Sequence, residues 1–227
     1  MNSLIELKNI SKNYNNNKKT IVLKKINFKF KKGLIYSLVG PSGSGKSTLL
    51  NLLSLIDQPS SGEIIINNKS TKYNDISMND QLRADKIGII YQQNNLLPDF
   101  NALENVYLAR LAIDNDKDKA ILDAKKIVKS FGLSNRSNHF PSELSGGELQ
   151  RVAISRALIN KPEIILADEP TGSLDHSTAK DVFKLLYKLK NKSRLIIYAT
   201  HNRLFANMAD CKLEMIDGNI KPSHAIK

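Results

Sequence analysis

A glycine-rich turn constrains this chain of 227 residues more than any other feature. The turn consists of Gly40, Pro41, Ser42, Gly43, Ser44, Gly45, Lys46, Ser47 and Thr48. It follows the run 34–39, which is apolar except for Ser37 and predicts a strand buried on both faces. It leads into a helical pattern over 47–55, which residues 57–59 close. Gly-x-x-x-x-Gly-Lys-Ser between a strand and a helix is the phosphate-loop pattern, so the chain is predicted to have an α/β fold with a phosphate site.

The residue types in this turn suit the binding of phosphate. Glycines let the backbone curl so that successive N–H groups point inward at an anion, and the helix N-terminus adds partial positive charge. We expect Lys46 to reach the β- and γ-phosphates of a nucleotide and Ser47 to ligate Mg²⁺. The alternative is a chance turn of glycines and serines, an event with odds on the order of one in a hundred in a chain of this length.

Strand patterns alternate with helical patterns along the rest of the chain. Alternating apolar residues at 4–10 and 22–30 predict antiparallel strands with one face in water. Further buried strands are expected at 63–66, 87–91, 164–167 and 195–199. Helices are expected at 147–159, after Asp175, and in a more polar insert that spans about residues 95–145. These elements predict a single domain over 1–227, with a mostly parallel core sheet, an N-terminal antiparallel β subdomain and an α-helical insert.

Composition narrows the class of protein. The net charge is +12, from 34 Lys and Arg against 22 Asp and Glu, which permits attraction to nucleic acid, anionic lipid or phosphorylated small molecules. The lysines are spread, and no basic segment is interleaved with aromatic residues, so we expect no nucleic-acid partner. The lone Cys211 excludes an intramolecular disulfide and fits a reducing compartment. No apolar run reaches the roughly 18 residues of a membrane span, and residues 1–6 lack a signal-peptide pattern, which predicts a cytosolic protein unless a partner holds it at a membrane.

Two adjacent carboxylates, Asp168 and Glu169, follow the apolar run 164–167. Open α/β sheets bind their ligands at the carboxyl ends of strands, and neighbours on an extended chain point to opposite sides. We therefore expect different roles: Asp168 holds Mg²⁺ through its water shell, and Glu169 faces the γ-phosphate and polarises the attacking water. The alternative is a pair of surface carboxylates.

A second anion site is predicted at the start of the helix at 147–159. Ser145 is a good N-cap, and Gly146 and Gly147 let a ligand approach closely. If the two phosphate sites belong to different edges of the fold, two copies that face head to tail would enclose two nucleotides. An ordinary capped helix start is the alternative.

The phosphate loop, residues 144–147 and residues 166–171 stand in the order found in the ATP-binding cassette (ABC) ATPases, which the chain resembles over essentially its whole length. The resemblance implies a P-loop NTPase with the ABC ATPase fold, ATP and Mg²⁺ as ligands, ATP hydrolysis, and a homodimer in the ATP-bound state. Catalytic roles are implied for Lys46, Gln92, Glu169 and His201, and Mg²⁺ contacts for Ser47, Gln92 and Asp168. Asp175 matches the nucleotide-binding D-loop, and Tyr14 matches the aromatic residue that stacks on adenine.

Several of these positions have simpler explanations. Tyr14 could be a surface or core residue, and His201 could cap a helix. Gln93 is an alternative to Gln92 for the catalytic glutamine, but the position of Gln92 relative to the end of the strand favours Gln92. Glu148 departs from the glutamine that many relatives carry; a carboxylate suits a helix N-terminus but repels a nearby phosphate.

Within the family, residues 96–100, 102–106 and 213–218 resemble the ATP-binding subunits of bacterial lipoprotein-releasing systems. This implies a peripheral protein at the cytoplasmic face of the inner membrane, held by integral membrane subunits of the LolC and LolE type. The implied work is release of lipoproteins toward the outer membrane. The alternatives are a cell-division ATPase of the FtsE type and the ATPase of another ABC export complex.

Overall fold

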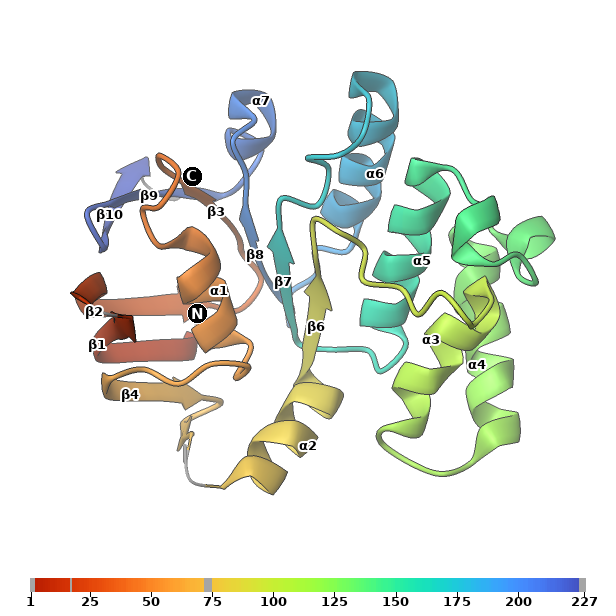
Figure 1. Ribbon diagram of the computed structural model, residues 1–227, viewed down its shortest axis with the longest axis horizontal. Helices are drawn as coiled ribbons and strands as arrows, with labels where there is room; N and C mark the ends of the chain where they lie inside the picture. The colour runs from red at the N-terminus through yellow and green to blue at the C-terminus, as the bar shows by residue number, and fades with distance from the viewer. Residues whose placement is uncertain (1–2, 17, 72–74, 225–227) are drawn as a thin grey trace.

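The computed structural model describes residues 3–16, 18–71 and 75–224. Two β-sheets lie side by side, and helices follow most strands of the larger one (Figure 1). The smaller sheet has the order β2-β1-β4-β5 and is antiparallel. Its strands are β1 (Ser3–Asn16), β2 (Lys18–Lys31), β4 (Ser61–Ile66) and β5 (Lys69–Ser70). The antiparallel pair predicted at the start of the chain is therefore confirmed, and both strands extend beyond the predicted ranges.

The larger sheet has the order β10-β9-β3-β8-β7-β6. All its pairs are parallel except β10 with β9. The strands are β3 (Ile35–Val39), β6 (Ile87–Ile90), β7 (Ile164–Asp168), β8 (Leu195–Ala199), β9 (Cys211–Ile216) and β10 (Asn219–His224). Because β3, β8 and β7 are adjacent and parallel, their carboxyl ends meet at one edge of the sheet. This edge carries the phosphate loop and the two carboxylates.

The helices cover both sheets and form the insert between β6 and α5. They are α1 (Lys46–Leu53), α2 (Ile76–Lys86), α3 (Ala102–Leu111), α4 (Lys117–Ser130), α5 (Gly146–Leu158), α6 (His176–Lys188) and α7 (Arg203–Ala206). Short 3₁₀ turns at Ser134–Arg136 and Pro141–Glu143 precede α5. Within the described ranges, no helix combines the length and apolar character that a bilayer span requires.

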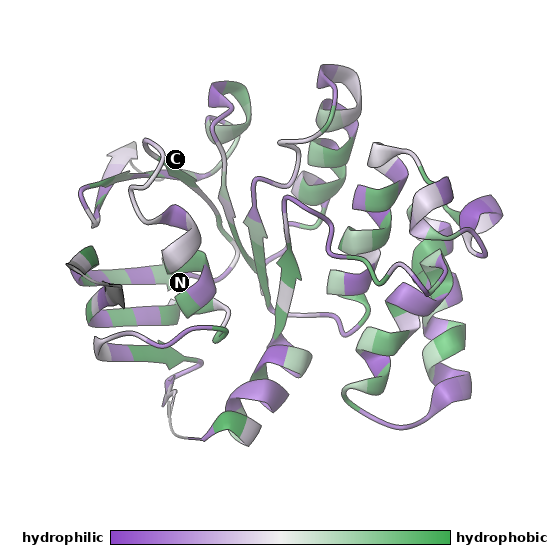
Figure 2. Ribbon diagram, viewed as in Figure 1, coloured by the Kyte–Doolittle hydropathy of each residue, from purple (hydrophilic) through white to green (hydrophobic). Residues whose placement is uncertain are grey.

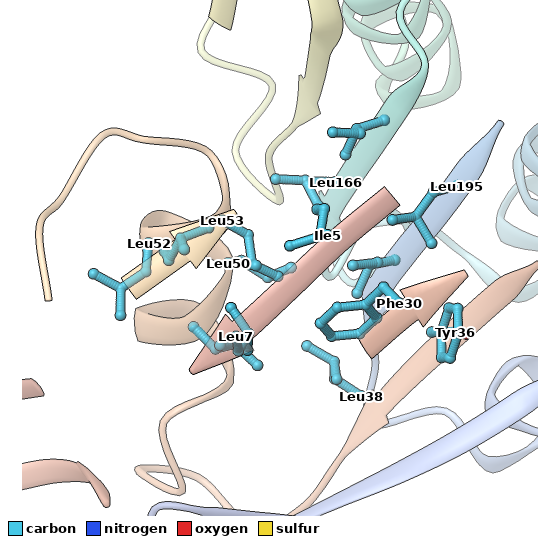
Figure 3. Packing of buried hydrophobic residues seen from close by; sticks show 14 of the residues in the cluster. Ile5, Leu7, Phe30, Tyr36, Leu38, Leu50, Leu52, Leu53, Leu166 and Leu195 are labelled. Atoms are coloured by element: carbon cyan, nitrogen blue, oxygen red, sulfur yellow. The ribbon is translucent and has the colours of Figure 1, made fainter. Parts of the chain in front are cut away.

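Hydrophobic burial holds these layers together. Figure 2 shows alternating hydropathy along β1 and β2, as expected for strands with one face in water, whereas β6 and β7 are mostly apolar. The main core lies between the two sheets and α1, where Phe30 and Tyr36 pack edge to face beside Leu38 (Figure 3). Each large apolar side chain that is fully buried contributes roughly 1.5–3 kcal/mol. The core thus anchors β3 and α1, the two elements that flank the phosphate loop.

A second core fills the other face of the larger sheet, and a third fills the insert. Helix α5 belongs to both, because Ile154 packs in the second core and Val152 in the third. The start of α5 is therefore held jointly by the sheet and the insert.

Candidate nucleotide-binding site

The phosphate loop joins the end of β3 to the start of α1. Gly40, Gly43 and Gly45 have φ values of 148°, 77° and 101°, which side chains rarely allow. A Cβ at Gly40 would lie 2.3 Å from the carbonyl oxygen of Met215, and one at Gly45 would lie 2.8 Å from Leu23. The loop can therefore follow this path only with glycine at these positions.

The loop curls around the side chain of Lys46. Its Nζ donates to the carbonyl oxygens of Gly40 and Pro41, each at 2.9 Å. Burial lowers the pKa of Lys46, and the carboxylates of Glu169 and Asp168 oppose that shift. Ser44 Oγ is buried and has no hydrogen-bond partner among the described residues. A buried orphan hydroxyl inside a ring of glycines fits a polar ligand that approaches the backbone closely.

A pocket of about 830 Å³ opens beside the loop. Ten of the predicted site residues line it: Ser42, Gly43, Gly45, Lys46, Ser47, Thr48, Gln92, Asp168, Glu169 and His201. Gly40 and Pro41 line a neighbouring hollow of about 560 Å³ together with His201. The structure thus gathers residues from four separate stretches of the chain around one cavity.

The two carboxylates differ in backbone conformation. Asp168 ends β7, but Glu169 has a φ of 45° and lies outside the strand. We had expected the two side chains to point to opposite sides because neighbours on an extended chain do so. That assumption does not hold for Glu169, because the chain turns there. Its N–H donates to the carbonyl of Ala199 at the end of β8 (3.1 Å), so the neighbouring strand holds the turn.

Glu169 lines the pocket and has one carboxylate oxygen without a hydrogen-bond partner among the described residues. Its Oε1 is buried, accepts no hydrogen bond from the described residues, and lies 3.6 Å from His201 Nε2. Burial raises the pKa of Glu169, although the backbone and charge of His201 act in the opposite direction. A buried acceptor without a donor is suited to binding a polarised water.

Gln92 and His201 complete the lining of this pocket. Gln92 lies close to Gly172, where a Cβ would come within 3.1 Å of its Nε2, whereas Gln93 is not part of the lining. The cap of α7 is Asn202, whose side chain accepts from the N–H groups of Leu204 and Phe205. His201 therefore does not cap that helix, and its exposed side chain reaches the pocket.

The predicted second anion site lies outside this pocket, at the start of α5. Figure 1 shows α1 and α5 on different sides of β7. Ser145 is the N-cap of α5, and both it and Gly146 are exposed. A Cβ at Gly147 would lie 2.5 Å from Thr178 of α6. Asp175 caps α6 by accepting from the N–H groups of Ser177 and Thr178, so this turn and the start of α5 form one surface.

The structure shows what Glu148 does in the single chain. Its carboxylate closes a capping box by accepting from the N–H and hydroxyl of Ser145, each at 2.8 Å, and Arg136 Nε donates to it at 2.9 Å. The bonds from Ser145 and then Arg136 lower the pKa of Glu148 to about 2. The carboxylate is thus satisfied by its own helix and by the insert.

This cap makes stability depend on pH. Because the folded-state pKa of Glu148 is about 2 against an ordinary 4.5, its ionised form stabilises the fold above about pH 4.5, and this is lost as pH falls toward 2. We expect Glu148→Gln to lower the free energy of unfolding by about 1 kcal/mol at pH 7, with a smaller difference near pH 3. Urea titrations at both pH values test this, with the exposed Glu63→Gln as control. An equal difference at both pH values would contradict the role of the charge.

Tyr14 lies on β1 and is not among the residues that line the pocket. Its hydroxyl donates to Asp57, and Lys12 Nζ lies 4.8 Å from the centre of its ring. The sequence patterns did not single out Lys12, and they indicated only a helix stop at 57–59. No local signal identifies this pairing, because 45 residues separate Lys12 from Asp57.

The donor set fits a nucleoside triphosphate with Mg²⁺. The glycine cradle and Lys46 offer N–H groups and a cation for phosphate, and Ser47, Gln92 and Asp168 offer the oxygen ligands that Mg²⁺ prefers. These features define a P-loop nucleoside triphosphatase. The chain belongs to the ABC transporter family, whose family model matches residues 23–172, and it is an ATP-binding cassette ATPase.

Known relatives and solved structures match nearly the whole chain. The lipoprotein-releasing system ATP-binding protein LolD of Rickettsia bellii is 44% identical and covers 98% of this chain and 99% of its own length. LolD of Shewanella frigidimarina is 39% identical, and the match covers 95% of this chain and 91% of that protein. The dimeric, ADP- and Pi-bound structure of the ATP-binding cassette MJ0796 has a TM-score of 0.90 at 37% identity, with 98% and 99% covered. The ABC ATPase fold expected from the sequence is confirmed.

Proposed function

We propose that the chain is the ATP-hydrolysing subunit of a complex that releases lipoproteins from the bacterial inner membrane toward the outer membrane. The observation that carries this proposal is similarity, over nearly the full length of both chains, to proteins named as LolD. The chain would bind integral membrane subunits of the LolC and LolE type and remain peripheral at the cytoplasmic face.

The pocket supports hydrolysis of ATP between two copies of the chain. Lys46 and the loop N–H groups bind the phosphates, and the Ser145 cap of the partner copy faces the same nucleotide from the other side. The solved structure of MJ0796 is a dimer bound to ADP and Pi, which supports this pairing. Because phosphoryl transfer passes through a loose transition state, positioning and charge neutralisation carry most of the catalysis.

Individual residues would divide the work at each site. Ser47, Gln92 and Asp168 would hold Mg²⁺, which neutralises charge on the phosphate oxygens when bound. Glu169 accepts a hydrogen bond from the attacking water, and His201 lies beside it to contact the γ-phosphate. Asp175, on the surface shared with the start of α5, would contribute to nucleotide binding. Tyr14 stacks on adenine.

Copurification tests the proposed partners. A tagged copy of the chain is purified from detergent-solubilised membranes, and the bound integral membrane subunits are identified by mass spectrometry. We expect two subunits of the LolC and LolE type, and we expect the reconstituted complex to release a lipoprotein from proteoliposomes when MgATP is added. Recovery of a cell-division membrane protein, or ATP-dependent activity without lipoprotein release, would refute the assignment.

A further inference from the structure

Three side chains form a closed network beside α1. Lys12 Nζ donates to Asp57 Oδ1 at 2.6 Å and to the carbonyl of Gln58 at 2.7 Å. The Tyr14 hydroxyl donates to the other carboxylate oxygen, Asp57 Oδ2, at 2.9 Å. Both oxygens of one carboxylate therefore hold partners from the same strand, β1.

Burial makes this network more than a surface ion pair. The Lys12 side chain is 11% exposed and that of Asp57 is 29% exposed, so solvent screens their attraction only in part. Burial acts to raise the pKa of Asp57, but the hydrogen bonds from Lys12, Tyr14 and the Gln58 N–H, together with the charge of Lys12, outweigh it and hold the pKa below its ordinary value. Asp57 thus remains ionised with both donors in place.

The network restrains the ring of Tyr14 at two points. Asp57 holds its hydroxyl, and the Lys12 ammonium lies 4.8 Å from the ring centroid, within the range of a cation–π contact. Tyr14 is 36% exposed, so part of its surface is open to solvent. A ring held at its hydroxyl and against a cation cannot rotate freely.

The ring also stands next to the nucleotide pocket. The Thr48 hydroxyl acts to lower the pKa of Tyr14, so the two side chains lie close together, and Thr48 lines the pocket two residues after Lys46. Tyr14 pairs with Thr20 on β2, and Val22 of the same strand is another lining residue. A base attached to a triphosphate in the phosphate loop can therefore reach the open part of the ring.

We infer that Lys12 and Asp57 are positioning residues that hold Tyr14 so that a nucleobase stacks on its open face. This inference rests on the stacking role of Tyr14 in the proposed function and adds the two residues that prepare the ring. It predicts that part of the affinity for ATP over base-free triphosphate depends on a carboxylate that does not line the pocket.

The test compares MgATP with Mg²⁺-bound inorganic tripolyphosphate, which has no base to stack. We expect Asp57→Asn to raise the dissociation constant and the KM for MgATP by roughly three- to tenfold, because it loosens but does not remove the stacking ring. The affinity for tripolyphosphate and the kcat for ATP should stay unchanged. Tyr14→Phe keeps the ring but loses the bond from its hydroxyl to Asp57 and the contact of that hydroxyl with Thr48, and it should shift MgATP affinity in the same direction.

Two further variants separate positioning from structural damage. In a Tyr14→Ala background, Asp57→Asn should have no additional effect on MgATP, since no ring remains to be positioned. Glu63→Gln, which removes an exposed ion pair with Lys8 on the same sheet, should change neither ligand.

Each other outcome points to a specific failure. Equal weakening of MgATP and tripolyphosphate by Asp57→Asn, or no change for MgATP, would overturn the positioning role. An unchanged ratio of the two affinities in Tyr14→Ala would instead remove the stacking role of Tyr14 and, with it, the basis of this inference, while leaving ATP hydrolysis and lipoprotein release intact.

Discussion

Glu169→Gln is expected to retain MgATP, stop phosphate release and accumulate as a stable dimer. The substitution keeps the size of the side chain but replaces a charged acceptor with a neutral amide. In the structure, Glu169 Oε1 is buried without a donor among the described residues, beside His201. Loss of a group that polarises water in the transition state lowers kcat by about 10²- to 10⁴-fold. Single-turnover phosphate release and size-exclusion chromatography with ATP measure both parts of the prediction.

Loss of folding should not account for this result. Burial raises the pKa of Glu169 in the folded chain. At pH values above its pKa in the unfolded chain, the ionised carboxylate therefore lowers the free energy of unfolding. The neutral glutamine removes that penalty, and the variant should unfold at pH 7 at a temperature equal to or above that of the wild type. Glu6→Gln, which removes an ion pair with Lys29, is the matched control with normal turnover. Phosphate release at the wild-type rate from Glu169→Gln would exclude the proposed role.

The same raised pKa predicts the pH profile of turnover. Activity requires ionised Glu169, so kcat/KM for MgATP, which reports the pKa values of the free enzyme, falls as pH drops through the pKa of Glu169 in the folded chain. That acid limb should lie above 4.5, the ordinary value for glutamate, and it should disappear from the residual activity of Glu169→Gln. A limb at or below 4.5 would contradict the assignment.

Lys46→Ala is expected to weaken nucleotide binding itself. Lys46 is buried in the loop, and its Nζ is held by two loop carbonyls at 2.9 Å, so the cation stands inside the cradle before a ligand arrives. Charge-assisted hydrogen bonds contribute roughly 1.5–3 kcal/mol each, which predicts a loss of affinity of about 10- to 100-fold. Titration with a fluorescent ATP analogue measures the dissociation constant directly.

The two variants should therefore fail at different steps. Lys46→Ala should bind MgATP weakly and form little ATP-dependent dimer. Glu169→Gln should bind MgATP with normal affinity and accumulate as the ATP-dependent dimer. Lys184→Ala, on the exposed surface of α6, controls for loss of a positive charge. Unchanged nucleotide affinity in Lys46→Ala would show that the backbone N–H groups bind the phosphates without it.

Local sequence patterns were sufficient to predict those features that depend on interactions between residues close together in the chain. The phosphate loop needs positive φ at Gly40, Gly43 and Gly45. Glycine adopts positive φ readily, so the spacing of these glycines in the sequence predicts the loop. The Ser145 cap was equally visible, since a capping box joins residues only three apart. The strands β3, β7 and β8 were predicted because strands buried on both faces are mostly apolar.

Elements without such a pattern were not predicted. In α2, Asn79 is the buried residue of the described stretch 76–86, so no apolar stripe marks the helix. Strands β9 and β10 form a short antiparallel pair at the edge of the larger sheet. The place of β9 depends on its pairing with β3, which lies more than 170 residues earlier in the chain, and β10 pairs with β9 in turn.

The amino-acid sequence by itself determined the phosphate loop, the helix caps and the alternation of strands and helices, because these arise from interactions within a few residues. Tertiary structure decided the turn at Glu169, which β8 holds through Ala199, and the attachment of Tyr14 to Asp57. Both depend on which distant segments lie side by side, and only the packed sheets bring those segments together.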